Sequence, residues 1–368
     1  MRIAKARVLH RSAPAEKPVK TAFGVMNARH AVILFLEDAD GRVGLGESWV
    51  NFPAWAPWER VAAFERCLIP YLVGREVGDV PDFIRGAWRD LVGGARQSGT
   101  RPTLLSAVSA VELALWDLRA RAEGKPLAAL LFAEPAQRVR VYASGINAPL
   151  PGELIEGMLE RGVTLFKLKL GFGADEDRRN LEAMKGRLEG RASLAVDVNR
   201  GWDFDSAARW LPELAALGVE WIEEPLREED EPRLGELAAM SSVPLAGGEN
   251  VMTPPGSAPG ELVRKPFAVL QPDLTKWAPL HVALDALKAA AEHGKRVVPH
   301  FLGSGPGQAA SLHFAAGCPE ALCEMDINRN PLRTGILDAP LAVEDGAVRL
   351  PDAPGLGWGL SETTDEHR

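Results

Sequence analysis

The sequence has few cysteines, no long apolar segment and no excess of positive charge, and each absence excludes a class of protein. Three cysteines among 368 residues cannot form a disulfide framework, and no CxxC pair is present for zinc. No apolar run approaches the roughly 18 residues of a membrane-spanning helix, and no signal peptide is visible. The formal charge is −8, from 42 Lys and Arg against 50 Asp and Glu, without a basic patch for phosphates. We therefore expect a cytoplasmic protein that binds neither membrane nor nucleic acid.

The patterns that are present divide the chain into three parts. Residues 1–125 begin with three β-rich runs and continue with helical patterns, which predicts a separate α+β unit. Residues 126–330 alternate short β-rich runs with amphipathic helices, which predicts a second domain. Residues 331–368 contain no further β/α unit, and we expect this tail to return to the N-terminal unit.

Eight short β-rich runs follow one another at similar spacing in the middle part. Between them lie amphipathic stretches such as 206–217 and 279–293. Strands and helices that alternate in this way form a parallel sheet that closes into a barrel. The sequence therefore predicts an α/β protein with a (β/α)7β-type TIM barrel, whose strands are expected at 139–145, 165–171, 193–199, 219–225, 243–249, 267–273, 296–300 and 322–326.

An ionisable side chain stands near the end of each run from the second onward. Successive members are 24 to 28 residues apart, the length of one β/α unit. All C-terminal strand ends of a barrel meet at one rim, where barrel enzymes place their active sites. One such residue alone is most often solvated or caps a helix, but a converging set of charges requires compensation. The set is Lys169, Asp197, Glu223, Glu249, Asp273, His300 and Glu324.

Three carboxylates, Asp197, Glu223 and Glu249, end three adjacent strands of this series. Oxygen ligands without His or Cys suit a hard cation, so the pattern predicts a Mg²⁺ site. Glu224 points the other way in a strict two-residue alternation, and we expect it to support the ligands from behind. The choice of Glu223 over Glu224 rests on the register that starts at Asp197.

Two lysines occupy alternate positions of one strand, so Lys167 and Lys169 face the same side. Their mutual repulsion and a nearby divalent cation would lower both pKa values, and a neutral lysine is a general base. The alternative is that both side chains extend to solvent.

Asp273 and His300 end consecutive strands. A carboxylate beside a histidine orients the ring and tunes its basicity, so this pair predicts a second acid/base unit. Glu324 ends the last strand of the series and is expected to face the same cavity. A protonated Glu324 would donate a hydrogen bond to a developing oxyanion.

Taken in order, these motifs resemble those of the enolase superfamily, specifically its mandelate racemase subgroup. The resemblance covers nearly the whole chain, and the ordered set is far more specific than any single motif. It implies that residues 1–125 and 331–368 form a capping domain and that residues 126–330 form the catalytic domain. One departure lies after the sixth barrel strand, where Trp277, Ala278 and Pro279 stand in place of the Gly-Gly pair often found in the family. The motifs are FKLKLG, AVDVN, WIEEP, GGENV, LQPDLTKW, VVPHFLGSGPG and CEMD.

The resemblance implies a metal-assisted proton abstraction. Asp197, Glu223 and Glu249 would hold Mg²⁺, which would chelate a substrate carboxylate. Lys169 would remove the proton α to that carboxylate, while Lys167 would lower the pKa of Lys169 and help to neutralise the substrate charge. Removing such a weakly acidic proton requires stabilisation of the second developing oxyanion.

By the same resemblance, the Asp273–His300 pair would serve the opposite face of the substrate, and Glu324 would steady the enolate. Three outcomes are open: dehydration of an acid sugar to a 2-keto-3-deoxy acid, racemisation or epimerisation of a 2-hydroxy acid, and opening of a sugar lactone by a cycloisomerase. We favour an acid-sugar dehydratase. A degenerate barrel that acts as a binding subunit and a Schiff-base aldolase that uses Lys169 are the alternatives from other classes.

Substrate identity is expected to depend on the capping domain and on loops at the rim. The segment 15–30 is a candidate lid. The substrate-binding candidates are Asn199, Trp202, Lys276 and Trp55. Trp49, Trp55 and Trp58 either line the pocket or pack the cap on the barrel. We expect the partners to be a small-molecule carboxylate and further copies of the chain, in a homo-oligomer between dimer and octamer.

Overall fold

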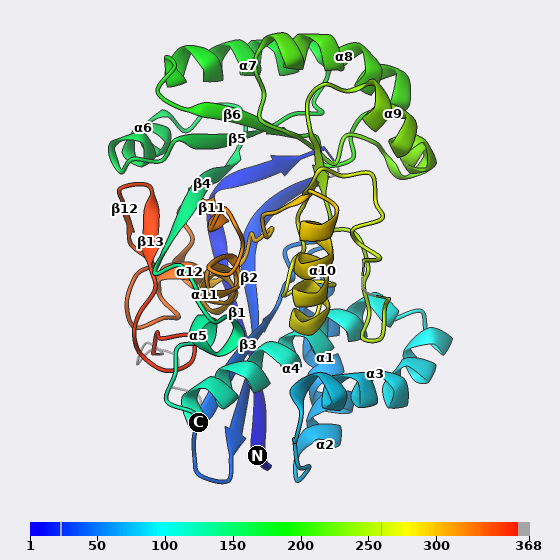
Figure 1. Ribbon diagram of the computed structural model, residues 1–368, viewed down its shortest axis with the longest axis vertical. Helices are drawn as coiled ribbons and strands as arrows, with labels where there is room; N and C mark the ends of the chain where they lie inside the picture. The colour runs from blue at the N-terminus through cyan, green and yellow to red at the C-terminus, as the bar shows by residue number, and fades with distance from the viewer. Residues whose placement is uncertain (23, 259, 360–368) are drawn as a thin grey trace.

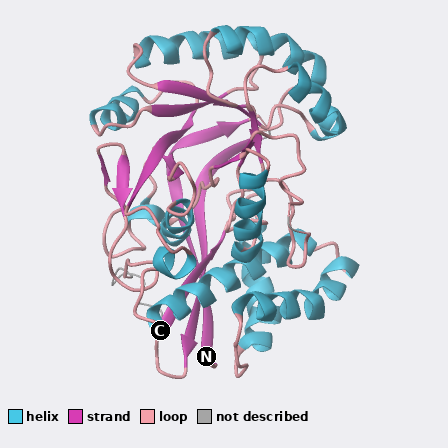
Figure 2. Ribbon diagram, in the orientation of Figure 1, coloured by secondary structure: helices cyan, strands magenta, loops and turns pink. Residues whose placement is uncertain are grey.

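The computed structural model describes residues 1–22, 24–258 and 260–359, and it contains two sheets (Figure 1). A three-stranded antiparallel sheet belongs to the N-terminal part, and a ten-stranded sheet forms the barrel and its extension. Helices lie outside the barrel strands (Figure 2). Within the described ranges, no helix combines the length and the apolar character needed to cross a membrane. The architecture is the predicted α/β barrel with an α+β cap.

The capping domain is built on a hairpin of two long strands. β1 (Ile3–Thr21) pairs with β2 (Gly24–Asp38), and β3 (Val43–Ser48) pairs with the other edge of β2. Leu34 and Leu36 of β2 are fully buried against the helices. These helices are α1 (Ala56–Ala63), the π-helical η1 (Phe64–Leu68), α2 (Ile69–Leu72), α3 (Val80–Gln97) and α4 (Arg101–Ala122).

Helix α4 is buried on nearly every side. Its apolar residues do not form a single stripe, as is typical of a helix inside a core. Strand β3 approaches it closely because β3 carries glycines, and a Cβ on Gly46 would lie 1.9 Å from the Ala110 carbonyl oxygen. Side-chain capping fixes the start of α3, where the Asp79 carboxylate accepts a hydrogen bond from the Asp82 N–H at 2.9 Å.

Eight parallel strands form the barrel, and they coincide with the eight predicted runs. β4 pairs with β5 on one side and with β11 on the other, which brings the first and last barrel strands together. The ladder then runs in chain order from β5 to β10. The strands are β4 (Arg138–Ile146), β5 (Leu165–Lys169), β6 (Ser193–Asp197), β7 (Ile222–Glu223), β8 (Leu245–Gly247), β9 (Val269–Leu270), β10 (Arg296–Val297) and β11 (Leu322–Asp326).

Alternation along each strand separates the barrel interior from the helix layer. Tyr142, Trp221 and Val269 pack together in one interior layer. Phe166 and Leu168 of β5 belong instead to the larger core beneath the helices. The alternate residues Lys167 and Lys169 therefore project into the barrel, as predicted.

Six α-helices connect the barrel strands in the described residues, with one departure from the repeat. The connection from β8 to β9 contains no helix where it is described, and residue 259 lies outside that description. Pro254 and Pro255 stand in this connection, and proline lacks the N–H that a helix needs. The helices are α6 (Gly152–Glu160), α7 (Ala174–Leu188), α8 (Phe204–Ala216), α9 (Leu234–Met240) after the 3₁₀ turn η2 (Glu228–Arg233), α10 (Leu280–Glu292) and α11 (Gly305–Ala315).

The C-terminal tail contacts both domains. α12 (Pro331–Thr334) lies beside β1, and β13 (Ala347–Arg349) pairs with barrel strand β4 and with β12 (Val343–Glu344). Further along, the Leu356 N–H donates to Asp117 of α4 at 2.7 Å. Residues 360–368 of the expected tail lie outside the described part of the chain.

The end of the β1–β2 hairpin reaches the barrel rim. A Cβ on Gly171 or on Gly201 would lie 3.2 or 2.9 Å from the Cβ of Ala22. The segment 15–30, expected as a lid, therefore consists of strand ends that lie against the loops after β5 and β6. Phe23 within it is outside the described residues.

Candidate active site

A cavity of about 320 Å³ opens where the C-terminal ends of the barrel strands meet the capping domain. Both domains contribute to its wall, so neither forms it alone. Its lining consists of Thr21, Trp49, Phe52, Lys169, Asn199, Arg200, Glu228, Glu249, Asn250, Lys276, His300 and Leu302.

Lys167 lies beneath this cavity, where it joins two carboxylates. Its Nζ donates to both oxygens of Glu223 at 2.7 and 2.8 Å and lies 2.8 Å from Oε1 of Glu324. The side chain is 1% exposed and stands over the Tyr142 ring. Burial lowers the pKa of Lys167, but Glu223 and Glu324 outweigh burial and raise it well above the ordinary value.

Lys169 lines the cavity and donates to Oδ2 of Asp197 at 2.8 Å and to Oδ1 of Asn199 at 2.7 Å. Burial lowers its pKa, yet Asp197 outweighs burial and the neighbouring Lys167, so the pKa is raised. Both pKa values are raised because each lysine donates to a carboxylate at 2.7 to 2.8 Å. The expected lowering depended also on a nearby divalent cation, so it stays a prediction.

The three predicted metal-binding carboxylates each have a cationic neighbour. Asp197 pairs with Lys169, Glu223 with Lys167, and Oε2 of Glu249 lies 3.1 Å from Lys276 Nζ and 3.3 Å from His300 Nε2. In the part of the chain that the structure describes, no three His, Cys, Asp or Glu side chains are gathered closely enough to hold a metal ion as they stand.

The donor chemistry of this trio nevertheless fits a hard divalent cation. All three donors are carboxylates, and they follow neighbouring strands β6, β7 and β8 of one ladder. Burial also raises the pKa of Glu223 to about 7, although Lys167 opposes this. The buried carboxyl groups of the site outnumber its buried cationic groups, which is the condition that a bound cation would relieve. The carboxyl groups are Asp197, Glu223, Glu224, Glu249, Asp273 and Glu324, and the cationic groups are Lys167, Lys169, Lys276 and His300.

Glu224 departs from the expected alternation. Its φ is 41°, in the left-handed region, so its side chain does not simply turn to the helix layer. It is buried among the site's charges and accepts a hydrogen bond from Asn250 Nδ2 at 2.7 Å. Burial first and then Glu249 raise its pKa to about 8. The strict period-2 argument therefore failed at this residue because the strand has already ended.

Two further residues at the rim share this unusual backbone. Asn199 and Arg200 have φ values of 45° and 60°. Their conformation is held by hydrogen bonds, because the Asn199 N–H donates to Oδ1 of Asp197 at 2.8 Å and the Arg200 N–H donates to the Glu224 carbonyl at 2.8 Å. Left-handed conformations of residues other than glycine cost about 1–3 kcal/mol each and gather at functional sites.

The predicted Asp–His pair is formed. Nδ1 of His300 lies 2.7 Å from Oδ2 of Asp273, and the Thr275 N–H and hydroxyl both donate to the other Asp273 oxygen. Burial lowers the pKa of His300, but Glu249, Glu324 and Asp273 outweigh it and raise the pKa to about 10. The imidazole is therefore held as a proton donor.

Glu324 corrects another expectation. It accepts hydrogen bonds from the Phe301 N–H and the Ser144 hydroxyl and pairs with Lys167. Burial raises its pKa, but Lys167 and His300 outweigh burial and lower it well below the ordinary range. Glu324 is a charged acceptor, so it does not donate a hydrogen bond to an oxyanion.

The four substrate-binding candidates divide evenly. Asn199 and Lys276 line the cavity. Trp202 does not, because it is buried with its ring stacked on Trp210, 5.5 Å between centroids. Trp55 does not line it either, since its side chain is 59% exposed at the start of α1.

Of the other two tryptophans considered, one lines the cavity. Trp49 donates from its ring N–H to the Leu302 carbonyl at 3.1 Å, and the Lys276 ammonium lies 4.7 Å from its ring centre. Trp58 is 61% exposed and meets His10 edge-on.

Sequence reasoning missed several polar residues of the site. Gln271 donates to Oε2 of Glu223 at 2.6 Å, and Asn250 accepts from Lys276 at 2.7 Å. The signal for Gln271 was its position two residues before Asp273 on one strand face. Asn250 had no such signal, because it lies in the loop after β8.

A capped (β/α) barrel with two lysines on strand β5 and an Asp–His pair across the ring is the architecture of the enolase superfamily. The family model of the mandelate racemase/muconate lactonizing enzyme N-terminal domain matches residues 3–131, and the enolase C-terminal domain-like model matches residues 152–364. The chain therefore belongs to the mandelate racemase/muconate lactonizing enzyme family.

Known relatives include lyases and isomerases. The chain is 30% identical to a D-galactarolactone cycloisomerase of Agrobacterium fabrum, over 93% of this chain and 92% of the relative. A solved mandelate racemase/muconate lactonizing enzyme from Bordetella bronchiseptica RB50 has 34% identity and a TM-score of 0.88, covering 99% and 98% of the two chains. A mutant L-talarate/galactarate dehydratase liganded with Mg and L-glucarate has 26% identity and a TM-score of 0.83, covering 99% and 91%.

Proposed function

We propose that the protein abstracts the proton α to a substrate carboxylate with the help of Mg²⁺ and dehydrates an acid sugar to a 2-keto-3-deoxy acid. The observation that carries this proposal is that Lys169, Glu249 and His300 line one cavity although they follow three different strands. A base, a carboxylate and an acid thus surround the same space.

Asp197, Glu223 and Glu249 are the residues that would hold Mg²⁺. When bound, the ion supplies positive charge to the substrate carboxylate as its second oxyanion develops. Lys169 must lose its proton to act as a base, and Asp197 is the partner that raises its pKa. If Asp197 bound a cation, it would stabilise the charged form of Lys169 less. The pKa of Lys169 would then fall, and Lys169 could act as a base.

His300 is the proposed proton donor. Loss of a β-hydroxyl as water needs such a donor on the leaving side, and Glu249, Glu324 and Asp273 raise the pKa of His300 and so favour its protonated form. Racemisation and lactone opening would use the same proton, so the preference for dehydration rests on the relatives that are acid-sugar dehydratases. Lys167 remains fixed between Glu223 and Glu324, where it contributes charge rather than proton transfer.

Cycloisomerisation is the second candidate, because the relative from Agrobacterium fabrum is a lactone cycloisomerase. The two reactions share the α-proton step and differ in the leaving group. We further propose that the partners are a small carboxylate substrate and additional copies of the chain.

The test is a screen of an acid-sugar and sugar-lactone library with Mg²⁺, read out as 2-keto acid formation and as α-deuterium incorporation from D₂O. Dehydration of at least one acid sugar that stops with EDTA is expected. A 2-keto product formed from a sugar lactone with no loss of water, so that its mass equals that of the lactone, would favour the cycloisomerase. Borohydride trapping that ignores EDTA would indicate a Schiff-base aldolase, and absence of both exchange and turnover across the library would favour a binding subunit.

A further inference from the structure

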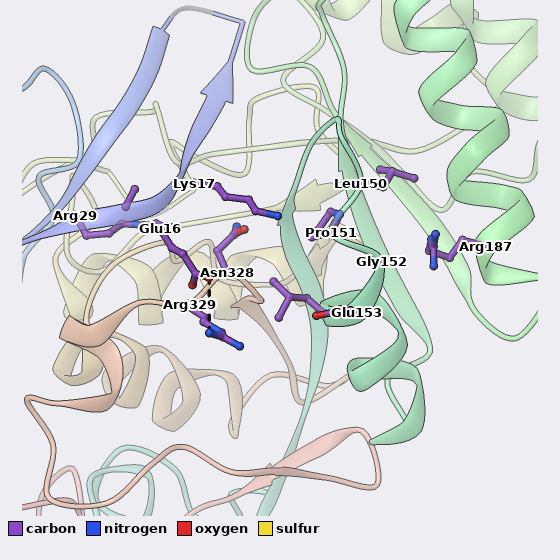
Figure 3. Close-up of a pocket in the computed structure, with 12 residues that line it drawn as sticks. Glu16, Lys17, Arg29, Leu150, Pro151, Gly152, Glu153, Arg187, Asn328 and Arg329 are labelled. Atoms are coloured by element: carbon purple, nitrogen blue, oxygen red, sulfur yellow. Dashed lines mark ion pairs between the residues drawn. The ribbon is translucent and has the colours of Figure 1, made fainter.

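A second cavity of about 500 Å³ has a lining of its own (Figure 3). It is bounded by the β1–β2 hairpin, the loop from β4 into α6 and the loop after β11, and it shares no lining residue with the active-site cavity. Its lining consists of Ala15, Glu16, Lys17, Arg29, Leu150, Pro151, Gly152, Glu153, Leu154, Arg187, Asn328 and Arg329.

The hairpin forms one wall through a bulge. Pro14 of β1 pairs with Ala28 of β2, but the next pair is Val19 with Met26, so four residues of β1 oppose one residue of β2. The extra residues leave the ladder and carry Glu16 and Lys17 to the cavity. In Figure 3 the Lys17 side chain extends toward Pro151 on the facing loop.

The buried side of this cavity carries more positive than negative charge. Arg29 is 2% exposed and its Nη2 lies 2.8 Å from Oδ2 of Asp326. Arg333 approaches the same carboxylate at 3.9 Å, so two arginines share one aspartate. Burial lowers the pKa of Arg333, Asp326 opposes this, and Arg29 lowers it further. Nε and Nη1 of Arg29 have no hydrogen-bond partner among the described residues.

Three exposed cations stand around the cavity, and two acids partly offset them. The cations are Lys17, Arg187 and Arg329, and the acids are Glu16 and Glu153. The pair of Arg329 and Glu16 is 3.6 Å apart with both side chains largely exposed, so it contributes little. The exposed cations outnumber the exposed acids by one, and behind them Arg29 and Arg333 outnumber Asp326 by one.

The start of α6 adds to this field. Its N-cap is Pro151, no side chain caps its first turn, and its first residue is Gly152. A helix N-terminus carries partial positive charge. A Cβ on Gly152 would lie 2.9 Å from the Arg187 guanidinium carbon, so glycine is what allows this arginine to approach the helix start.

We propose that this cavity binds a small molecule that carries two negative charges on oxygen, as a phosphate ester or a dicarboxylate does. Arginine and lysine on opposite walls, with a helix N-terminus, are the groups that recognise such anions. The volume lies within the range of small-molecule sites. The bound anion would contact Lys17 and Arg187, while the buried Arg29 contributes its charge from behind.

Binding is tested by calorimetry with inorganic phosphate and with succinate as probes, at constant ionic strength set by chloride. Saturable binding of at least one probe is expected, and the double variant Lys17→Gln/Arg187→Gln should weaken it at least tenfold. Arg179→Gln, an exposed arginine on the same helix as Arg187, is the matched control and should leave binding unchanged. The relative affinities of the two probes then assign the site to phosphate esters or to dicarboxylates.

Because both substituted side chains are exposed, folding of the double variant is not at risk as it would be for Arg29. Binding that survives the double variant but is lost in Lys276→Gln would place the anion in the active-site cavity and overturn the proposal. Weak, non-saturable heats that chloride reproduces would overturn it as well.

Discussion

At the scale of single residues, the structure leaves open whether Glu223 or Glu224 is the carboxylate ligand of Mg²⁺ after strand β7. Glu223 accepts hydrogen bonds from Lys167 and Gln271, whereas Glu224 accepts from Asn250 and lies near Glu249. We predict that Glu223→Gln lowers Mg²⁺ affinity by more than tenfold, because it removes a ligand charge. Glu224→Gln should cost less than tenfold. Calorimetric Mg²⁺ titration of both variants decides between them, and the opposite order would move the ligand to Glu224.

The proposed base and acid make a second prediction at this scale. Lys169→Ala and His300→Asn are each expected to lower turnover by about 10³-fold, because each removes one proton-transfer group. Mg²⁺ affinity should not fall in either variant, since neither residue is a proposed ligand and each substitution removes a cation that pairs with one. Steady-state kinetics and Mg²⁺ calorimetry measure the two effects. Full activity in either variant would contradict its role.

Which residues face the cavity was predictable, but their charge states were not. Strand period and barrel topology are local properties, and they correctly brought Lys169, Asp273 and His300 together. The ionisation of Glu324 depends instead on cationic groups 157 and 24 positions away, Lys167 and His300. No local pattern contains that information.

At the scale of elements, the strands were predictable and some connections were not. Each barrel strand carries its own apolar pattern, so all eight appear where expected. The sequence did not decide the role of Trp202, because a tryptophan after a strand is equally consistent with lining a ligand site and with packing against a helix. Stacking on Trp210 of α8 decided the matter, and that contact exists only once α8 has packed.

His313 on α11 provides a prediction about how elements are joined. Its Nδ1 accepts from the Ala128 N–H at 3.1 Å, and its Nε2 donates to the Leu356 carbonyl at 3.0 Å. The ring therefore links α11 to α5 (Leu127–Leu131) and to the C-terminal tail, in the neutral form. Burial lowers the pKa of His313 to about 4.

The free energy of unfolding depends on pH through His313. The unfolded chain protonates this group near pH 6.5 and the folded chain only near 4, so stability falls as the pH drops between these values. From pH 7 to pH 5 we expect a loss of about 2 kcal/mol from this group. Urea unfolding of His313→Gln should show a weaker pH dependence over that range, whatever its absolute stability. The exposed His293→Gln is the control, and an unchanged slope in His313→Gln would refute the assignment.

At the scale of the whole molecule, the active site exists only where the two domains meet. Thr21, Trp49 and Phe52 come from the cap, and Lys169 and His300 come from the barrel. Backbone contacts reinforce the junction, since the Trp49 N–H donates to the Thr275 carbonyl at 2.9 Å beside Asp273. Sequence alone indicated the cap segments that hold Thr21 and Trp49, but it did not distinguish Trp49, which lines the cavity, from Trp55 and Trp58, which are exposed.

Glu47 of β3 is the cap residue that holds the loop after His300. Its carboxylate is 1% exposed and accepts from the Ser304 N–H and hydroxyl at 2.8 and 2.6 Å and from the Gly307 N–H at 2.8 Å. These donors lie at the start of α11, where a carboxylate is also favoured by the helix dipole. The loop they anchor begins at His300, the proposed proton donor, so we expect this contact to couple the position of the cap to catalysis.

We predict that Glu47→Gln destabilises the protein by about 2–4 kcal/mol, because an amide N–H₂ group would face donors that the carboxylate now satisfies. Turnover should fall further than the substrate KM changes, since His300 would lose its fixed position while the binding residues stay. Urea unfolding, amide exchange at Ser304 and Gly307, and steady-state kinetics measure these effects. Glu37→Gln on the neighbouring strand, paired only with Lys5 at the surface, should change none of them. A Glu47→Gln variant with parental stability and turnover would show that the cap reaches the active site without controlling it.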